Sequence, residues 1–269
     1  MLTSFTKINK DCNSLYNEDL AAAKKLNVEI EGCVPYFQKY SNKGVLLVHG
    51  FAASPMELFP LAKALEQLDY SVYIVRVAGH GSNVENFIST TYNDWYKSIE
   101  LGYNTLASFC EKICVVGQSN GGLLATTVAK YNKVDCLVLL APAYKVKVFS
   151  FHLIPYIKNI IKSVPRKIKD IKYNYKVFPT KPLYEMMLLQ KEVQQFASDI
   201  DVPVLLAISP KDILVSPKVA KETVDNMKSH DKTIYIYDNK EYDVKHILTE
   251  EKSEKIIKDI SLWIKEKLG

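Results

Sequence analysis

Short apolar runs alternate with longer segments of helical periodicity along most of the chain. Residues 44–49 form a continuous apolar run, as expected of a strand that is covered on both faces of its sheet. Residues 56–68 follow with apolar side chains near helical spacing. The same patterns predict further strands at 71–75, 112–117, 135–140, 203–208 and 233–237, and further helices at about 92–110, 120–131 and 250–267. This alternation predicts an α/β protein with a mostly parallel, doubly covered sheet.

The alternation breaks between Ala143 and Ser198. A proline inside a helix removes a hydrogen bond and clashes with the preceding turn. Four prolines therefore predict several short helices and loops here: Pro155, Pro165, Pro179 and Pro182. We interpret the stretch as an insertion. The predicted organisation is a core of residues 1–142 and 199–269 with an inserted subdomain, residues 143–198.

The composition is that of an ordinary globular protein. The 269 residues are 48% hydrophobic and 24% charged, which suits one α/β domain with an insertion. The five cysteines have neither CxxC nor Cys/His spacing, which indicates a reducing compartment, no disulfide framework and no zinc site. Residues 1–27 lack the apolar core of a secretory signal, and no run reaches the roughly 18 apolar residues of a membrane span. The expected location is the cytoplasm.

Positive charge is concentrated between Lys145 and Lys181. This stretch holds ten basic residues and one acid, Asp170, a net charge of +9 in a chain that carries +5 overall. Such a run can bind anionic lipid headgroups or an acidic substrate. It can also be the solvated face of a lysine-rich protein, and on sequence alone we favour that second interpretation.

The segment Gly117-Gln118-Ser119-Asn120-Gly121 matches the pattern GxSxG and joins a predicted strand to a predicted helix. In this arrangement the serine occupies a strained turn, and only glycine fits at the two flanking positions. The hydroxyl then projects beside a helix N-terminus, which favours developing negative charge. Ser119 is the predicted nucleophile, and an ordinary glycine-rich turn is the alternative.

Two backbone N–H groups are predicted to form an oxyanion hole. One belongs to Asn120, directly after the nucleophile, and the other to Phe51, in the loop after the first long strand. His49 stands at the end of that strand. We predict that it braces the loop and is not the catalytic base.

A serine nucleophile needs a histidine to take its proton and a carboxylate to orient that histidine. The order along the chain in such folds is serine, acid, histidine. His246 follows the last strand and is the predicted base, whereas His230 precedes that strand and is predicted to be solvated. Asp212 follows the 203–208 strand at its carboxyl end and is the predicted acid.

Four other aspartates are less suited to the role of acid. Asp199 and Asp201 precede the 203–208 strand and would point to the wrong side. Asp238 and Asp243 are so close to His246 in sequence that their side chains could rarely orient its ring. The spacing therefore favours Asp212.

These motifs resemble the bacterial carboxylesterase and monoacylglycerol lipase group of the α/β-hydrolases. The resemblance runs from about residue 44 to the C-terminus and is weakest in the insertion. Besides the turn around Ser119, the matching segments are 45–51, 76–81 (the GHG loop), 94–96, 102–103 and 202–203 leading to Asp212. Two residues depart from the family's pattern: Asn120 replaces a more usual Met or Leu, and Lys245 replaces a small residue before the histidine.

The resemblance implies an α/β-hydrolase fold with a small helical cap made by the insertion. It also implies a serine esterase without cofactor or metal, whose partner is a short- to medium-chain ester or a monoacylglycerol; no nucleic acid is expected. A lysophospholipase, thioesterase or acyltransferase would use the same triad, and a peptidase or carbon–carbon bond hydrolase stays open. A non-catalytic binding protein on this fold would be expected to lack a triad member. A dehalogenase or epoxide hydrolase is disfavoured because it would carry an aspartate in place of Ser119.

The insertion is rich in apolar residues that could line an acyl slot or pack the insertion onto the core. Both interpretations stay open for each residue. The set comprises Phe149, Phe151, Leu153, Ile154, Ile157, Ile160, Ile161, Met186, Met187, Leu188 and Leu189.

Overall fold

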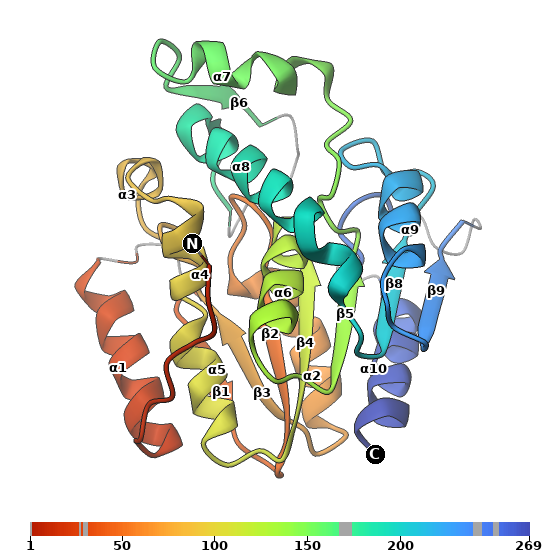
Figure 1. Cartoon of the computed structure of the whole chain (residues 1–269). Helices are drawn as coiled ribbons and strands as arrows, with labels where there is room; N and C mark the ends of the chain where they lie inside the picture. Colours follow the sequence, from red (N-terminus) through yellow and green to blue (C-terminus); the bar gives the residue numbers. More distant parts are fainter. Residues whose placement is uncertain (1, 27, 29–31, 167–173, 239–243, 250–252) are drawn as a thin grey trace.

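A seven-stranded sheet lies at the centre of the molecule (Figure 1), in the order β1-β3-β2-β4-β5-β8-β9. The computed structural model describes residues 2–26, 28, 32–166, 174–238, 244–249 and 253–269. Neighbouring strands are parallel except for β1, which is antiparallel to β3 at one edge. The strands are β1 Tyr36–Gln38, β2 Lys43–Val48, β3 Ser71–Val75, β4 Lys112–Gln118, β5 Cys136–Leu140, β8 Val204–Ile208 and β9 Lys232–Ile236. The predicted, mostly parallel sheet is confirmed.

Helices cover both faces of this sheet (Figure 1). On one face lie α5 (Glu100–Ala107), α6 (Asn120–Tyr131) and α9 (Pro217–Asp225), with α1 (Cys12–Lys25) packed outside α5. On the other face lie α2 (Phe59–Glu66) and α10 (Glu254–Leu268), which contact each other. Strands β3, β5 and β8 are buried along their whole length. Burial from both sides explains why these strands are continuous apolar runs.

Two predicted helices are shorter than their periodicity suggests. The helix expected over 92–110 divides into α4 (Tyr92–Lys97) and α5. Between them the Ser98 hydroxyl donates to the Trp95 carbonyl at 2.7 Å, and such a bond competes with regular helical geometry. The helix expected over 56–68 begins as the 3-10 helix η1 (Pro55–Leu58). Pro60 lacks an N–H and is tolerated only in a first turn, so α2 begins at Phe59.

The segment between β5 and β8 lies over the carboxyl edge of the sheet (Figure 1). It contains η2 (Phe149–Leu153), α7 (Ile154–Ile157), the antiparallel pair β6 (Ser163–Pro165) and β7 (Val177–Pro179), α8 (Thr180–Phe196) and η3 (Ala197–Asp199). The 17 residues of α8 contradict the expectation that this stretch holds only short helices. Pro182 falls in the first turn of α8, where no intrahelical N–H bond is lost.

Helix α8 connects this segment to the core. It packs on α6, and it also contacts α4 and the short α3 (Val84–Ile88). None of the helices in the described ranges is both long and apolar enough to cross a membrane.

Candidate active site

Ser119 occupies the turn between β4 and α6. Its backbone has φ 55° and ψ −116°, a strained conformation for a residue with a side chain. Surrounding backbone groups hold it there: its N–H donates to the Leu140 carbonyl at 2.8 Å, and its carbonyl accepts from the N–H groups of Gly122 at 2.9 Å and Ala143 at 3.0 Å. The hydroxyl is therefore presented from a rigid turn at the carboxyl edge of the sheet.

The two glycines of this turn are required by close backbone contacts. A Cβ atom on Gly117 would lie 2.2 Å from the carbonyl oxygen of Gly121. A Cβ atom on Gly121 would lie 2.1 Å from the carbonyl oxygen of Val48. Any side chain at either position would push α6 away from the sheet, so the turn needs glycine on both sides of Ser119.

Ser119, His246 and Asp212 form a chain of hydrogen bonds. His246 Nε2 lies 2.8 Å from Ser119 Oγ, and His246 Nδ1 lies 2.7 Å from Asp212 Oδ2. With its proton on Nδ1, the ring donates to the carboxylate and accepts from the serine hydroxyl. Asp212 is fully buried, whereas the His246 side chain keeps 15% of its surface exposed. The structure thus brings together the three residues that the sequence singles out.

The loop after β8 fixes the direction of the Asp212 carboxylate. Its Oδ1 accepts from the N–H groups of Leu214 at 2.8 Å and Val215 at 3.0 Å. Its Oδ2 is then directed at His246. Because Oδ1 is held by two backbone donors, the carboxylate cannot rotate without losing them.

The oxyanion candidates lie on two separate elements next to Ser119. Asn120 is the first residue of α6, and Phe51 lies in the loop after β2. A Cβ atom built on Gly50 would be 3.4 Å from the Ser119 Cβ, so this loop passes close to the nucleophile. Among the hydrogen bonds of the described ranges, neither the Phe51 N–H nor the Asn120 N–H donates to another protein group. Both donors are available to a ligand.

Two buried histidines brace the Phe51 loop from behind. The rings of His49 and His80 lie 5.0 Å apart. His49 Nδ1 contacts the Gly50 carbonyl at 2.9 Å while its Nε2 accepts from a backbone N–H. His80 Nε2 accepts from the Ala52 N–H at 3.0 Å. Burial lowers the pKa of His49 to about 4 and lowers that of His80 well below its usual value, so both rings are neutral. His49 thus has the bracing role predicted for it, and His80, in the GHG loop, shares it.

The 143–198 segment holds the same loop from the other side. Ala52 has a φ of 55°, and its carbonyl accepts from Arg166 Nη1 at 2.9 Å and from the Tyr175 N–H at 3.1 Å. The Arg166 guanidinium also lies 5.1 Å from the ring centroid of Phe178. Burial lowers the pKa of Arg166, and nearby Glu57 opposes that shift. No sequence motif reveals this contact, because Ala52 and Arg166 are 114 positions apart.

Glu57 connects the Phe51 loop to the loop that carries the histidine. Its Oε2 accepts from the Gly50 N–H at 2.7 Å, and its carbonyl accepts from the Thr249 hydroxyl at 2.8 Å. The backbone carbonyl of His246 in turn accepts from Gln118 Nε2 at 3.0 Å. Sequence reasoning missed Glu57 and Gln118, since single side chains that bond distant backbone leave no periodic signal.

The other titratable candidates have different environments. His230, Asp201 and Asp238 are exposed. Asp199 forms ion pairs of 2.8 and 2.7 Å with two lysines, which lower its pKa to about 2. Asp243 lies outside the described residues. Only Asp212 among the aspartates of the described ranges bonds to His246.

The apolar residues of the 143–198 segment divide into three groups. Four are buried in the hydrophobic core: Phe151, Ile154, Met186 and Leu189. Three are half-buried, namely Ile157, Met187 and Leu188. Three are exposed, namely Leu153, Ile160 and Ile161. The side chain of Phe149 lies outside the described part.

The chain is similar to several known proteins. The model of the family Hydrolase_4, described as serine aminopeptidase S33, matches residues 40–180 and 162–250. The chain is 30% identical over 211 residues to a thermostable monoacylglycerol lipase of Bacillus sp. (strain H-257), covering 76% of this chain and 84% of that protein. It is 23% identical over 230 residues to a carboxylesterase of Bacillus subtilis (strain 168), covering 83% and 92%.

Solved structures show the same arrangement of sheet and helices. The structure described as LipS and LipT, two metagenome-derived lipolytic enzymes, matches with a TM-score of 0.79 and 21% identity, covering 88% of this chain and 99% of that one. A monoacylglycerol lipase of Paleococcus ferrophilus matches with a TM-score of 0.71 and 20% identity, covering 87% and 99%. The fold is therefore that of the α/β-hydrolases.

Proposed function

Because this chain belongs to the Hydrolase_4 family of serine hydrolases, we propose that it hydrolyses short- to medium-chain acyl esters or monoacylglycerols through an acyl-enzyme on Ser119. Two of its relatives are described as a monoacylglycerol lipase and a carboxylesterase, and both names denote ester hydrolysis. The observation that carries the proposal is the unbroken series of hydrogen bonds from Ser119 through His246 to Asp212.

Acylation begins at the serine hydroxyl. Ser119 Oγ attacks the ester carbonyl carbon while His246 Nε2, already 2.8 Å away, takes its proton. Asp212 holds the ring in the tautomer that can accept this proton and stabilises the positive charge that forms on it. The carbonyl oxygen becomes negative and is bound by the N–H groups of Phe51 and Asn120.

Breakdown of this intermediate returns the proton to the substrate. The imidazolium of His246 protonates the leaving alcohol, and the acyl group stays on Ser119. Water then attacks the acyl-enzyme with His246 again acting as base, which releases the acid and restores the serine. No step in this sequence calls for a metal or a cofactor.

A substrate panel tests the proposal. We expect p-nitrophenyl esters and monoacylglycerols of graded chain length to be hydrolysed, with the highest kcat/KM at short to medium acyl chains. The panel includes aminoacyl p-nitroanilides, because the family description names an aminopeptidase, and an added acceptor alcohol, which reports acyl transfer. The proposal would be overturned if the protein hydrolysed the anilides but not the esters. It would also be overturned if transfer of the acyl group to the added alcohol dominated over hydrolysis.

Arg166 is expected to influence the rate through the position of the Phe51 loop. Replacing Arg166 with alanine removes one of the two donors to the Ala52 carbonyl, so the neighbouring Phe51 N–H is less well placed in the transition state. We expect kcat for p-nitrophenyl esters to fall on the order of tenfold with KM little changed, since a small misplacement of a catalytic group is costly.

The conservative variant Arg166→Lys should recover part of this loss, because lysine can still donate to the carbonyl. Lys176→Gln removes a positive charge from an exposed position next to Tyr175 and serves as the control. A rise in KM at unchanged kcat, or an equal loss in Lys176→Gln, would contradict a positioning role for Arg166.

A further inference from the structure

We propose that the outer tip of the 143–198 segment docks on the surface of an anionic phospholipid bilayer. This docking tip comprises residues 148–162, which include η2 and α7, together with Lys181 at the start of α8. It lies at the end of the molecule beyond the carboxyl edge of the sheet (Figure 1). The proposal concerns this surface alone and does not depend on the reaction at Ser119.

Exposed apolar side chains gather on the docking tip. Within the described part of the chain ten large apolar side chains are exposed, and five of them fall between positions 148 and 161. The two with the largest exposed fractions are Ile160 at 83% and Tyr156 at 78%. The other three are Val148, Leu153 and Ile161. A contiguous apolar group on a surface marks a contact with another apolar phase or partner.

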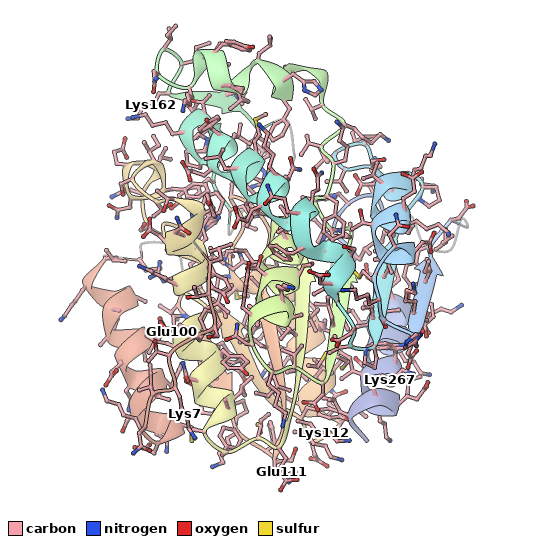
Figure 2. The ribbon with its side chains drawn as sticks, viewed as in Figure 1. Lys7, Glu100, Glu111, Lys112, Lys162 and Lys267 are labelled. Carbon is pink, nitrogen blue, oxygen red and sulfur yellow. The ribbon has the colours of Figure 1, made fainter. Side chains whose placement is uncertain are left out.

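Lysines surround a hollow beside these apolar side chains. The hollow has a volume of about 280 Å³ and is lined by Ile88, Lys158, Asn159, Ile160, Lys162 and Lys181. Lys162, which Figure 2 labels at this end of the molecule, pairs with Glu85 at 2.6 Å, and both partners are well exposed. An exposed pair of this kind is weak, so a phosphate can compete for the lysine. The hollow therefore has a net positive charge, because three lysines line it and Glu85 supplies one carboxylate beside it.

A lysine-rich rim around exposed apolar residues fits the interface of an anionic membrane. The apolar side chains of Tyr156 and Ile160 can enter the boundary between headgroups and acyl chains, while the lysines remain at the level of the phosphates. A second copy of the chain fits less well, because a symmetric contact would place lysines against lysines. The apolar cluster also argues against the purely solvated face favoured from sequence, since a solvated charge run has no need of exposed isoleucine and tyrosine.

Sedimentation with vesicles tests the proposal without any turnover. The full chain is mixed with vesicles of phosphatidylcholine alone or of phosphatidylcholine with phosphatidylserine, and the bound fraction is measured at low and high salt. We expect binding to the anionic vesicles only, and weaker binding at high salt because the charges are screened. The double variant Lys162→Gln/Lys181→Gln should lower the partition coefficient on the order of tenfold. Tyr156→Ser/Ile160→Ser should lower it by a similar factor.

Matched controls remove the same groups elsewhere. Lys218→Gln/Lys221→Gln on α9 removes two exposed lysines, and Leu262→Ser on α10 removes an exposed apolar side chain. Both should bind like the unaltered chain. The proposal is overturned if anionic vesicles retain no protein, if neutral vesicles bind it equally well, or if the controls lose as much binding as the tip variants. It is also overturned if the tip variants dissociate a dimer, because the surface would then serve self-association.

Discussion

Replacing Ser119 with alanine is expected to lower kcat for ester hydrolysis by about 10⁵- to 10⁶-fold, because no other group can form the acyl-enzyme. The fold should survive, since the bonds that hold position 119 are made by its backbone. Loss of the Cβ-bound hydroxyl removes only one bond, to His246. The measurement is the initial rate on a p-nitrophenyl ester, with thermal unfolding followed in parallel.

An exposed serine provides the control for this experiment. Ser89→Ala removes a hydroxyl that bonds only to a nearby carbonyl at the end of α3, and its kcat should equal that of the unaltered chain. Serine-directed fluorophosphonate should label the unaltered chain and not Ser119→Ala. Substantial residual turnover in Ser119→Ala, with labelling retained, would show that another residue is the nucleophile.

Replacing Asp212 with asparagine is expected to lower kcat by about 10⁴-fold through the tautomer of His246. The N–H groups of Leu214 and Val215 require an oxygen at the Oδ1 position, so the new amide nitrogen would face His246 Nδ1. That nitrogen donates, and it would force Nδ1 to accept and Nε2 to carry the proton. A protonated Nε2 cannot take the proton of Ser119.

The control for this change is Asp238→Asn, an exposed aspartate close to His246 in sequence. Its rate should be unaffected. Because the mechanism is a wrong tautomer, the rate of Asp212→Asn should recover at high pH, where hydroxide assists the loss of the serine proton. If the two variants have equal rates, Asp212 does not orient the base.

Most of the sheet and the nucleophile turn were predictable, because each depends on residues that are neighbours in sequence. The apolar runs at β2, β4 and β5 reflect burial on both faces. The pattern around Ser119 reflects two backbone contacts that only glycine permits. Asp212 and His246 could be ranked because parallel strands bring their carboxyl ends to one edge.

The elements that sequence reasoning missed depend on contacts between distant residues. The edge strand β1 is three residues long and only half-buried, so it has no apolar run to reveal it. The sequence does not predict the length of α8, because prolines such as Pro182 are expected to interrupt helices, whereas Pro182 stands in the first turn of α8. The bonds of Arg166 and Glu57 to the Phe51 loop involve single polar side chains with no spacing rule.

The two hydrogen bonds of Glu57 have a consequence for the relative placement of the catalytic groups. One residue receives the Gly50 N–H on its carboxylate and the Thr249 hydroxyl on its carbonyl. The loop that carries the Phe51 N–H and the loop that carries His246, which are almost 200 positions apart along the chain, are therefore both held by the same residue of η1. We therefore expect a small displacement of η1 to carry both loops in the same direction, and to change the distance between His246 and the Phe51 N–H less than it changes the position of either one.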